Sequence, residues 1–351
     1  MPLDLSRLVG GITLLATGTM LLGCERSGAR PEETSQAAPP ADSAVAPAAS
    51  LPQQIANVVV KLNGGVHTGF RFMHAKGIVT SGTFTPTPEA KALSRAAHFN
   101  GPSVPVTVRF SNAPGIPTNA DNSPGSGPRG IAIRFTLPGG AFTDIVSISH
   151  HGFVVGTGED FLAFLKAVAA SGPDAPQPKP LKTFLGSHPR AAKFLMEVQA
   201  RPESYATLAY FGNNAFVFVE ASGKKQVVRY QVVPVAGVAN LDSAAAAKAG
   251  EDYLQEDIQH RLAKGPVQFR LYAQLPNPGD PTNDGSIVWP DDRKRVLLGT
   301  IRLTKVEPNQ EELQRSLTFN PTFLTSGIEL SDDPLVPLRS AVYALSVAHR
   351  H

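Results

Sequence analysis

Short segments of alternating apolar and polar residues recur along most of this chain, and they constrain its fold more than any other feature. In residues 104–111, the apolar side chains of Val104, Val106, Val108 and Phe110 alternate with Pro105, Thr107, Arg109 and Ser111. Successive side chains of a strand point to opposite faces, so this pattern predicts a half-buried strand. Further strands are predicted at 130–135, 143–149, 215–220, 226–233, 267–275 and 296–303. Ser222-Gly223 separates two of them, which is typical of an antiparallel hairpin.

Helices are predicted between the strands. Thr87-Pro88-Glu89 places a proline at the first helical position. Thr157 is followed by acidic residues in a pattern close to a capping box. Residues 243–262 are rich in alanine and predict one helix that contains Gly250 and ends before Gly265. Spaced strands with interleaved helices predict an α+β fold, an antiparallel β-barrel core with surrounding helices.

The N-terminal residues have the pattern of an export signal. Arg7 precedes an apolar run over residues 8–22, which is shorter than the roughly 20 residues of a membrane span. The run ends in Leu21-Leu22-Gly23-Cys24, which resembles a bacterial lipobox, in which the cysteine is lipidated and becomes the new N-terminus. An ordinary signal peptide with an incidental cysteine is the alternative. Cys24 is the only cysteine of the chain, so an intrachain disulfide is impossible.

Residues 25–53 are mostly Ala, Pro, Ser and Glu, and such a segment buries too little apolar surface to offset its ordering entropy. We therefore predict a lipoprotein signal peptide over residues 1–24, a flexible tether over 25–53 and a folded region over 54–351. The expected location is the periplasm, with membrane contact only through a lipid anchor. The formal net charge of +3 gives no indication of a nucleic-acid partner.

Two motifs near the ends of the folded region resemble the active-site signatures of the haem catalases. Arg71-Phe72-Met73-His74-Ala75-Lys76-Gly77 resembles the family's Arg-x-x-His-Ala-Lys-Gly, and Arg339-Ser340-Ala341-Val342-Tyr343 resembles its Arg-x-x-x-Tyr. The resemblance covers about residues 55–351 and is greatest to the small catalase-related peroxidases of bacteria. It implies the family's barrel fold and haem b as cofactor.

The same resemblance implies a role for each matching residue. His74 is the distal base that moves a proton between the two peroxide oxygens, a task suited to imidazole. Tyr343 is the proximal iron ligand, and Arg339, four residues earlier on a helix, favours its phenolate. Ser111 orients His74 and shares a strand face with Arg109. The remaining cofactor contacts are propionate-facing Arg71, Arg109 and Arg350, and Phe161, which follows Phe153 by eight residues.

The chain departs from the family pattern in one strand. Catalases carry an asparagine there that helps the distal histidine hold peroxide, and a gapless alignment places Ile148 at that position. A shifted alignment would place His151 in the pocket instead. His150 and His151 could alternatively bind a metal, but adjacent residues of a strand point to opposite faces and are poor joint ligands.

Three functions are compatible with these features. The first is a peroxidase that reduces hydrogen peroxide or an organic peroxide with a small-molecule reductant, with weak catalase activity. The second is a hydroperoxide isomerase or lyase of the allene oxide synthase type, which an apolar Ile148 would suit. The third is a non-enzymatic haem-binding lipoprotein, against which the presence of both His74 and Ser111 argues.

Overall fold

A computed structural model describes residues 49–123, 125–197 and 201–350 of the 351-residue chain. The predicted signal peptide and most of the predicted tether therefore lie outside the described residues. The first described helix, α1, begins at Leu51, so the folded region starts earlier than the predicted boundary after residue 53. Pro52 stands in the first turn of α1, and the apolar residues that follow it are buried, which draws these residues into the fold.

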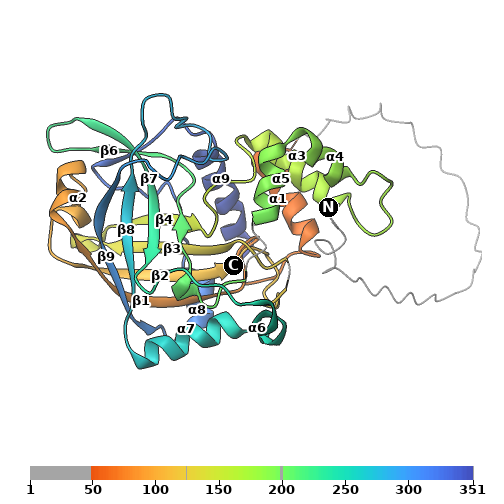
Figure 1. The fold of residues 1–351 in the computed structure, drawn as a ribbon, viewed down its shortest axis with the longest axis horizontal. Helices are drawn as coiled ribbons and strands as arrows, with labels where there is room; N and C mark the ends of the chain where they lie inside the picture. The colour runs from red at the N-terminus through yellow and green to blue at the C-terminus, as the bar shows by residue number, and fades with distance from the viewer. Residues whose placement is uncertain (1–48, 124, 198–200, 351) are drawn as a thin grey trace, which may run out of the picture.

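An antiparallel β-barrel forms the centre of the molecule (Figure 1). Among the described residues, eight strands close a ring in the order β1-β2-β3-β4-β5-β7-β8-β9, and β9 pairs back onto β1. β6 and β10 extend the sheet beside β7. The strands are β1 Gly77–Pro86, β2 Val104–Asn112, β3 Arg129–Thr136, β4 Phe142–Ile148, β5 Tyr210–Phe211, β6 Phe216–Val219, β7 Lys225–Pro234, β8 Val267–Gln274, β9 Arg295–Val306 and β10 Ile328–Leu330.

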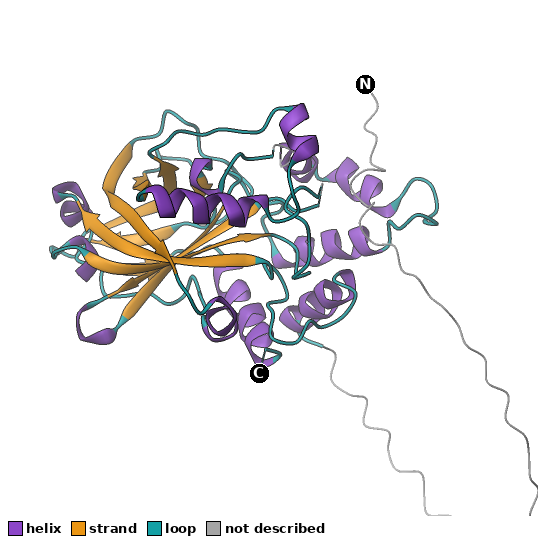
Figure 2. Cartoon of the chain, turned by 90° about the horizontal axis from the view of Figure 1, so that it is seen from below, coloured by secondary structure: helices purple, strands orange, loops and turns teal. Residues whose placement is uncertain are grey.

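The helices lie outside the barrel (Figure 2). Those of the described residues are α1 Leu51–Leu62, α2 Pro88–Leu93, α3 Gly158–Ala169, α4 Pro180–Ser187, α5 Pro189–Glu197, α6 Ser243–Lys248, α7 Tyr253–Lys264, α8 Gln310–Ser316 and α9 Leu335–Ala348. In Figure 1, α1, α3, α4 and α5 gather on one side, and α9 lies between them and the barrel. Helix α9 thus lies between the barrel and the group of outer helices α1, α3, α4 and α5.

The apolar side chains of the alternating strand β2 fill the barrel interior. Val108 and Phe110 are fully buried in the main apolar core, while Arg109 and Ser111 point to the opposite face of the strand. A second apolar cluster joins α1, α3 and α9, with Ile55 of α1 and Leu162 of α3 buried against Val342 of α9. This cluster fixes α9 against the outer helices.

Most predicted elements are confirmed, and one is wrong. Each predicted strand matches a described one within a few residues, and Thr157 caps α3 by accepting a hydrogen bond from the Asp160 N–H at 3.1 Å. The single helix predicted at 243–262 is two helices, α6 and α7, separated by residues 249–252. The backbone carbonyls in this break accept hydrogen bonds from Asn122 and Lys76, so tertiary contacts replace helical ones there.

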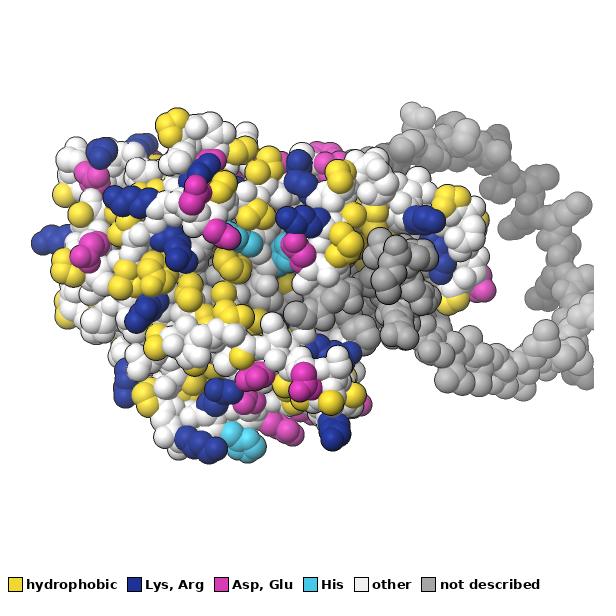
Figure 3. Space-filling model, viewed as in Figure 1, with side chains coloured by type: hydrophobic (Ala, Val, Ile, Leu, Met, Phe, Trp, Pro, Cys, Tyr) yellow, Lys and Arg dark blue, Asp and Glu magenta, His cyan; other side chains and the backbone are white. Residues whose placement is uncertain are grey.

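Positively and negatively charged side chains are interspersed on the face of the molecule that Figure 3 shows.

Within the described part of the chain, no helix combines the length and the apolar character needed to cross a membrane.

Candidate active site

His74 lies in the loop between α1 and β1, in a backbone conformation that non-glycine residues rarely adopt. Its φ is 58°, in the left-handed region. Hydrogen bonds hold this conformation: the His74 N–H donates to the Ala113 carbonyl at 2.8 Å, and the Arg109 guanidinium donates to the His74 carbonyl at 2.8 Å. The surrounding structure thus fixes the direction of the imidazole.

Ser111 and Gly130 form the strand surface beside this imidazole. The Ser111 Oγ lies 3.0 Å from His74 Nδ1, as the resemblance to the catalases implies. Gly130 stands opposite Ser111 in the β2–β3 pairing. A Cβ atom at Gly130 would lie 2.7 Å from Ser111 Oγ and 2.9 Å from His74 Nδ1, so any larger residue would displace the pair.

The environment keeps the His74 ring neutral. Burial lowers its pKa to about 3, and the positive charges of Arg109, Arg339 and Arg71 act in the same direction. With Nδ1 occupied by the serine hydroxyl, Nε2 is the nitrogen left to exchange a proton with a substrate. The imidazole is therefore unprotonated at neutral pH, and in the tautomer whose Nδ1 donates to the serine, Nε2 is free to accept a proton.

Three arginines from separate parts of the chain converge near this loop. Arg71 and Arg350 both donate to the backbone carbonyls of Gln314 and Leu317, and Arg109 donates to the Gln314 side-chain oxygen at 2.6 Å. In the described part of the chain, none of the three has a carboxylate within 4.0 Å, the limit for a salt bridge. Burial lowers the pKa of Arg109 to about 10, so its guanidinium is charged at neutral pH. The cluster therefore carries positive charge that no carboxylate of the described residues neutralises.

Gln314 was not predicted from the sequence, because nothing in its surroundings marks it. Its amide oxygen accepts from Arg109 and, at 3.3 Å, from Arg71, and its amide nitrogen donates to the Gly77 carbonyl at 2.9 Å. A neutral acceptor holds the two guanidinium groups in place and leaves their charge unneutralised.

Helix α9 presents Tyr343 and Arg339 one turn apart. Arg339 donates to the Tyr343 hydroxyl oxygen at 3.0 Å, which confirms the predicted pairing of these two side chains. The other end of the guanidinium donates to Asn214, whose amide in turn donates to Asp333 at 2.8 Å. This chain of bonds fixes the orientation of Arg339.

The two predicted motifs meet in space. The Phe72 N–H, two residues before His74, donates to the Ser346 hydroxyl of α9 at 3.0 Å, and Ser346 is three residues beyond Tyr343. Phe161 of α3 packs against the apolar cluster that includes Val342, and its ring centroid lies 5.3 Å from that of Phe153. The predicted site residues therefore surround one region between the barrel and α9.

Ile148, and neither histidine, lies on the strand surface beside His74. Ile148 pairs with Gly130 in the β3–β4 ladder, so it continues the row that begins at Ser111. His151 instead stacks on Phe211 with ring centroids 4.2 Å apart, and His150 bonds to Glu197 at 3.0 Å. Among the described residues, no group of His, Cys, Asp or Glu side chains could hold a metal ion. The alternative metal site at the two histidines is thus not formed.

These residues fit a haem. A haem carries two carboxylates, which the unneutralised cluster of Arg71, Arg109 and Arg350 suits, and the Arg350 Nε is buried without a hydrogen-bond partner among the described residues. Tyr343, with Arg339 bonded to its oxygen, is a residue that would hold the iron, and His74 is a residue that would exchange protons beside it. The fold and the site are therefore those expected of a haem-binding barrel protein.

Comparison with known proteins identifies the family. The family described as Catalase matches residues 68–351, and the chain belongs to it. The chain is 38% identical over 294 residues to a catalase-related peroxidase of Mycolicibacterium paratuberculosis, covering 83% of this chain and 92% of that protein. It is 34% identical over 289 residues to a catalase-related peroxidase of Synechococcus elongatus, covering 82% and 85%.

Solved structures confirm the fold. A fungal catalase aligns with a TM-score of 0.72 at 22% identity, covering 81% of this chain and 60% of that one. A bacterial catalase aligns with a TM-score of 0.71 at 22% identity, covering 92% and 68%.

Proposed function

We propose that this protein is a haem-dependent peroxidase that reduces hydrogen peroxide or an organic peroxide, with haem b as its cofactor and a small molecule as its reductant. One observation carries the proposal: two hydrogen-bonded pairs, His74 with Ser111 and Tyr343 with Arg339, belong to the same candidate site. The His74 ring of the first pair is neutral. The relatives named catalase-related peroxidase support it.

Each side chain of the site has a separate role. A bound haem would supply the two electrons that the O–O bond needs to break. His74 accepts a proton from one peroxide oxygen at Nε2 and returns it to the other, so that water leaves. Ser111 holds the imidazole in the orientation that this transfer needs. Arg339 orients the Tyr343 oxygen by donating a hydrogen bond to it.

Ile148 favours peroxidase over catalase turnover. An isoleucine donates no hydrogen bond, so the strand beside Gly130 offers nothing at this position to hold a second peroxide as a reductant. Cleavage of the first peroxide depends on His74, which is present. We therefore infer that an external reductant returns the enzyme to rest.

The absorption spectrum of the haem-loaded protein tests this function. Peroxide should shift the haem band and a reductant should restore it. His74→Ala should keep the haem and lose turnover, whereas Tyr343→Phe should lose the ferric-phenolate spectrum. Turnover of a lipid hydroperoxide without any reductant would show an isomerase or lyase instead. A haem band that does not respond to peroxide would show a haem-storage protein.

We further propose export to the periplasm and lipid anchoring through Cys24, on the strength of the Leu21-Leu22-Gly23-Cys24 pattern. Incorporation of a labelled fatty acid into the wild type and not into Cys24→Ala would support the anchor. Equal labelling of both proteins would exclude it.

A further inference from the structure

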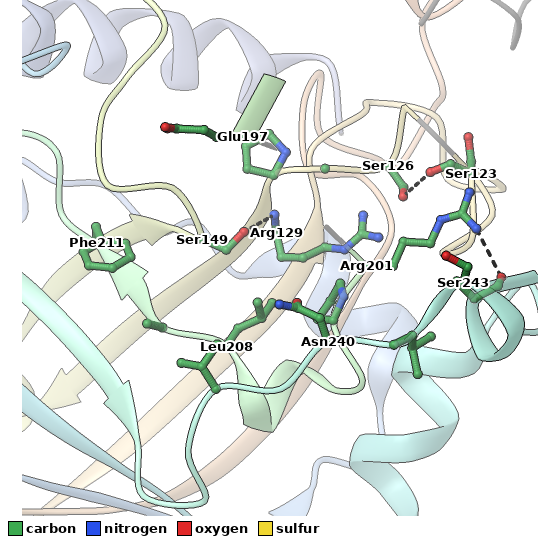
Figure 4. A pocket seen from close by; sticks show the side chains of 17 residues that line it. Ser123, Ser126, Arg129, Ser149, Glu197, Arg201, Leu208, Phe211, Asn240 and Ser243 are labelled. Atoms are coloured by element: carbon green, nitrogen blue, oxygen red, sulfur yellow. Dashed lines mark hydrogen bonds between the residues drawn. The ribbon is translucent and has the colours of Figure 1, made fainter. Parts of the chain in front are cut away.

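A cavity of about 720 Å³ lies beside the start of β3 and the end of β4 (Figure 4). Its walls come from the loop before β3, the residue after β4, the segments before and within β5, and the start of α6. The residues used in the argument below are Arg129, Arg201, Ser149, Leu208, Phe211 and Glu197. The proposed peroxidase mechanism uses none of them.

The cavity carries positive charge without a matching anion. Arg129 is only 3% exposed, and its Nε and Nη1 atoms have no hydrogen-bond partner among the described residues. Its Nη2 donates to a backbone carbonyl, that of Asp121, at 2.8 Å. Burying a guanidinium without an anion costs free energy, which a bound anion would offset.

A second guanidinium lines the same cavity. Arg201 is half-buried and donates to the Ala246 carbonyl at 3.1 Å. Neither Arg129 nor Arg201 has a carboxylate within salt-bridge distance in the described part of the chain. The Glu197 carboxylate on the wall is already bonded to His150 at 3.0 Å and to Lys193 at 3.6 Å. The cavity therefore favours an anionic ligand.

The rest of the lining suits an apolar body with one polar end. Leu208 and Phe211 form an apolar part of the wall, and Figure 4 shows them on the side away from Arg201. Such a division matches a flat apolar molecule that carries one carboxylate. Arg201, which is accessible, would contact the carboxylate, and the buried charge of Arg129 would act on it from the wall.

The cavity adjoins the strand surface of the candidate active site. Arg129 immediately precedes Gly130, which pairs with Ser111 and leaves the space that the His74 ring occupies. Ser149, whose Oγ accepts a hydrogen bond from the Arg129 N–H at 2.9 Å, immediately follows Ile148. The cavity therefore shares strands β3 and β4 with the candidate active site.

We propose that this cavity binds the reductant, and that the reductant is an aromatic carboxylate with an oxidisable phenol. The proposal rests on the proposed peroxidase function. Each phenol loses one electron and one proton. Two phenols therefore supply the two electrons and two protons that convert one hydrogen peroxide into two waters. The two phenoxyl radicals leave as products.

Calorimetric titration of the haem-loaded protein with benzoate tests the site independently of turnover. Benzoate should bind the wild type, and benzyl alcohol, its neutral counterpart, should bind far more weakly. Arg201→Gln should weaken benzoate binding about tenfold or more, the effect of losing one charge-assisted hydrogen bond. Arg129→Gln should weaken it as well, and Arg302→Gln, on the exposed face of β9, should have no effect. The haem band should not change on binding.

Steady-state kinetics then tests the reductant role. The wild type should show a lower KM for 4-hydroxybenzoate than for 4-hydroxybenzyl alcohol, and Arg201→Gln should remove most of that difference. Equal KM values in the wild type would overturn the reductant role.

The remaining outcomes separate this proposal from the proposed function. Oxidation of phenols without any binding of benzoate would overturn the site and leave the peroxidase function standing. A haem band that shifts with benzoate would place the anion at the haem and also overturn the site. Binding of benzoate without oxidation of either phenol would overturn the reductant role, and the peroxidase function would then stand or fall with the response of the haem band to peroxide.

Discussion

At the scale of single residues, the site depends on the absence of a side chain as much as on the presence of one. Gly130 has ordinary backbone angles, so its role is to leave space for the His74–Ser111 pair. A methyl group there would lie within 3.0 Å of both side chains, closer than real atoms approach. The positions of the proton-transferring groups are therefore set partly from the neighbouring strand.

Gly130→Ala should consequently reduce the rate of the first reaction with peroxide by about tenfold or more, because a misplaced base loses most of its contribution. Haem content should stay close to that of the wild type, since the arginines and Tyr343 are unaffected. Stopped-flow absorption measures the rate. Gly172→Ala is the matched control, because a Cβ at Gly172 would meet no atom within 4 Å. An unchanged rate in Gly130→Ala would show that the close approach relaxes without cost.

Gln314 permits a second test at this scale. In Gln314→Glu, a carboxylate would neutralise one of the two guanidinium groups that the amide holds now, and it would compete with the haem carboxylates. We expect haem to bind about tenfold more weakly, equivalent to about 1.4 kcal/mol. Titration of the apoprotein with haem measures this. Gln310→Glu adds the same charge one turn earlier on α8, where the side chain bonds to Val79 and to no arginine, and should bind haem normally.

At the scale of elements, the short 3-10 turn Ala97–Phe99 carries a titratable group into the barrel core. His98 is 1% exposed, packs against the rings of Phe84, Phe99 and Phe135, and has no hydrogen-bond partner among the described residues. Burial lowers its pKa to about 3. The folded protein therefore keeps this ring neutral at pH values where the unfolded chain protonates it.

This difference makes stability sensitive to acid. In the unfolded chain, His98 takes up a proton below the ordinary histidine pKa near 6.5. The free energy of unfolding therefore falls as the pH drops from about 6.5 towards 3, and this group has no such effect above pH 6.5. Between pH 7.5 and pH 4.5, the wild type should lose about 2.7 kcal/mol more than His98→Leu. Urea unfolding at both pH values measures this. His260→Leu, on the exposed side of α7, should lose as much as the wild type, and parallel losses in all three proteins would refute the assignment.

At the scale of the whole molecule, the site lies where two layers meet. His74, Arg109 and Ser111 belong to the barrel side, while Tyr343 and Arg339 belong to α9, which the apolar cluster fixes to α1 and α3. A haem that contacts both sides binds only the folded protein, so it stabilises that state.

Removal of the haem should therefore lower the melting temperature, and addition of haem to the apoprotein should restore it. At a free haem concentration about 100 times the Kd, the expected gain is about 2.7 kcal/mol. Circular dichroism of the apo and loaded forms measures the difference. Tyr343→Phe should show a smaller gain because it loses the iron ligand. Identical melting temperatures for the apo and loaded wild type would mean that the haem does not bridge the layers.

The sequence by itself determined most of the strands and the contacts within single elements. Alternation in 104–111 predicted both the buried face of β2 and the shared face of Arg109 and Ser111, because strand geometry has a fixed period of two. The spacing of Arg339 and Tyr343 predicted their contact, because a helix brings residues four apart together. Such local rules need no knowledge of the rest of the chain.

Only the tertiary structure decided the remainder. The break between α6 and α7 follows from hydrogen bonds to Asn122 and Lys76, more than a hundred residues away, which outweigh the helical preference of an alanine-rich segment. Gln314 holds Arg71 and Arg109 only because α8 packs beside β1, and the space left by Gly130 matters only because β3 lies against β2. These contacts join residues far apart in the chain, and no local pattern of residue types records which distant segments will meet.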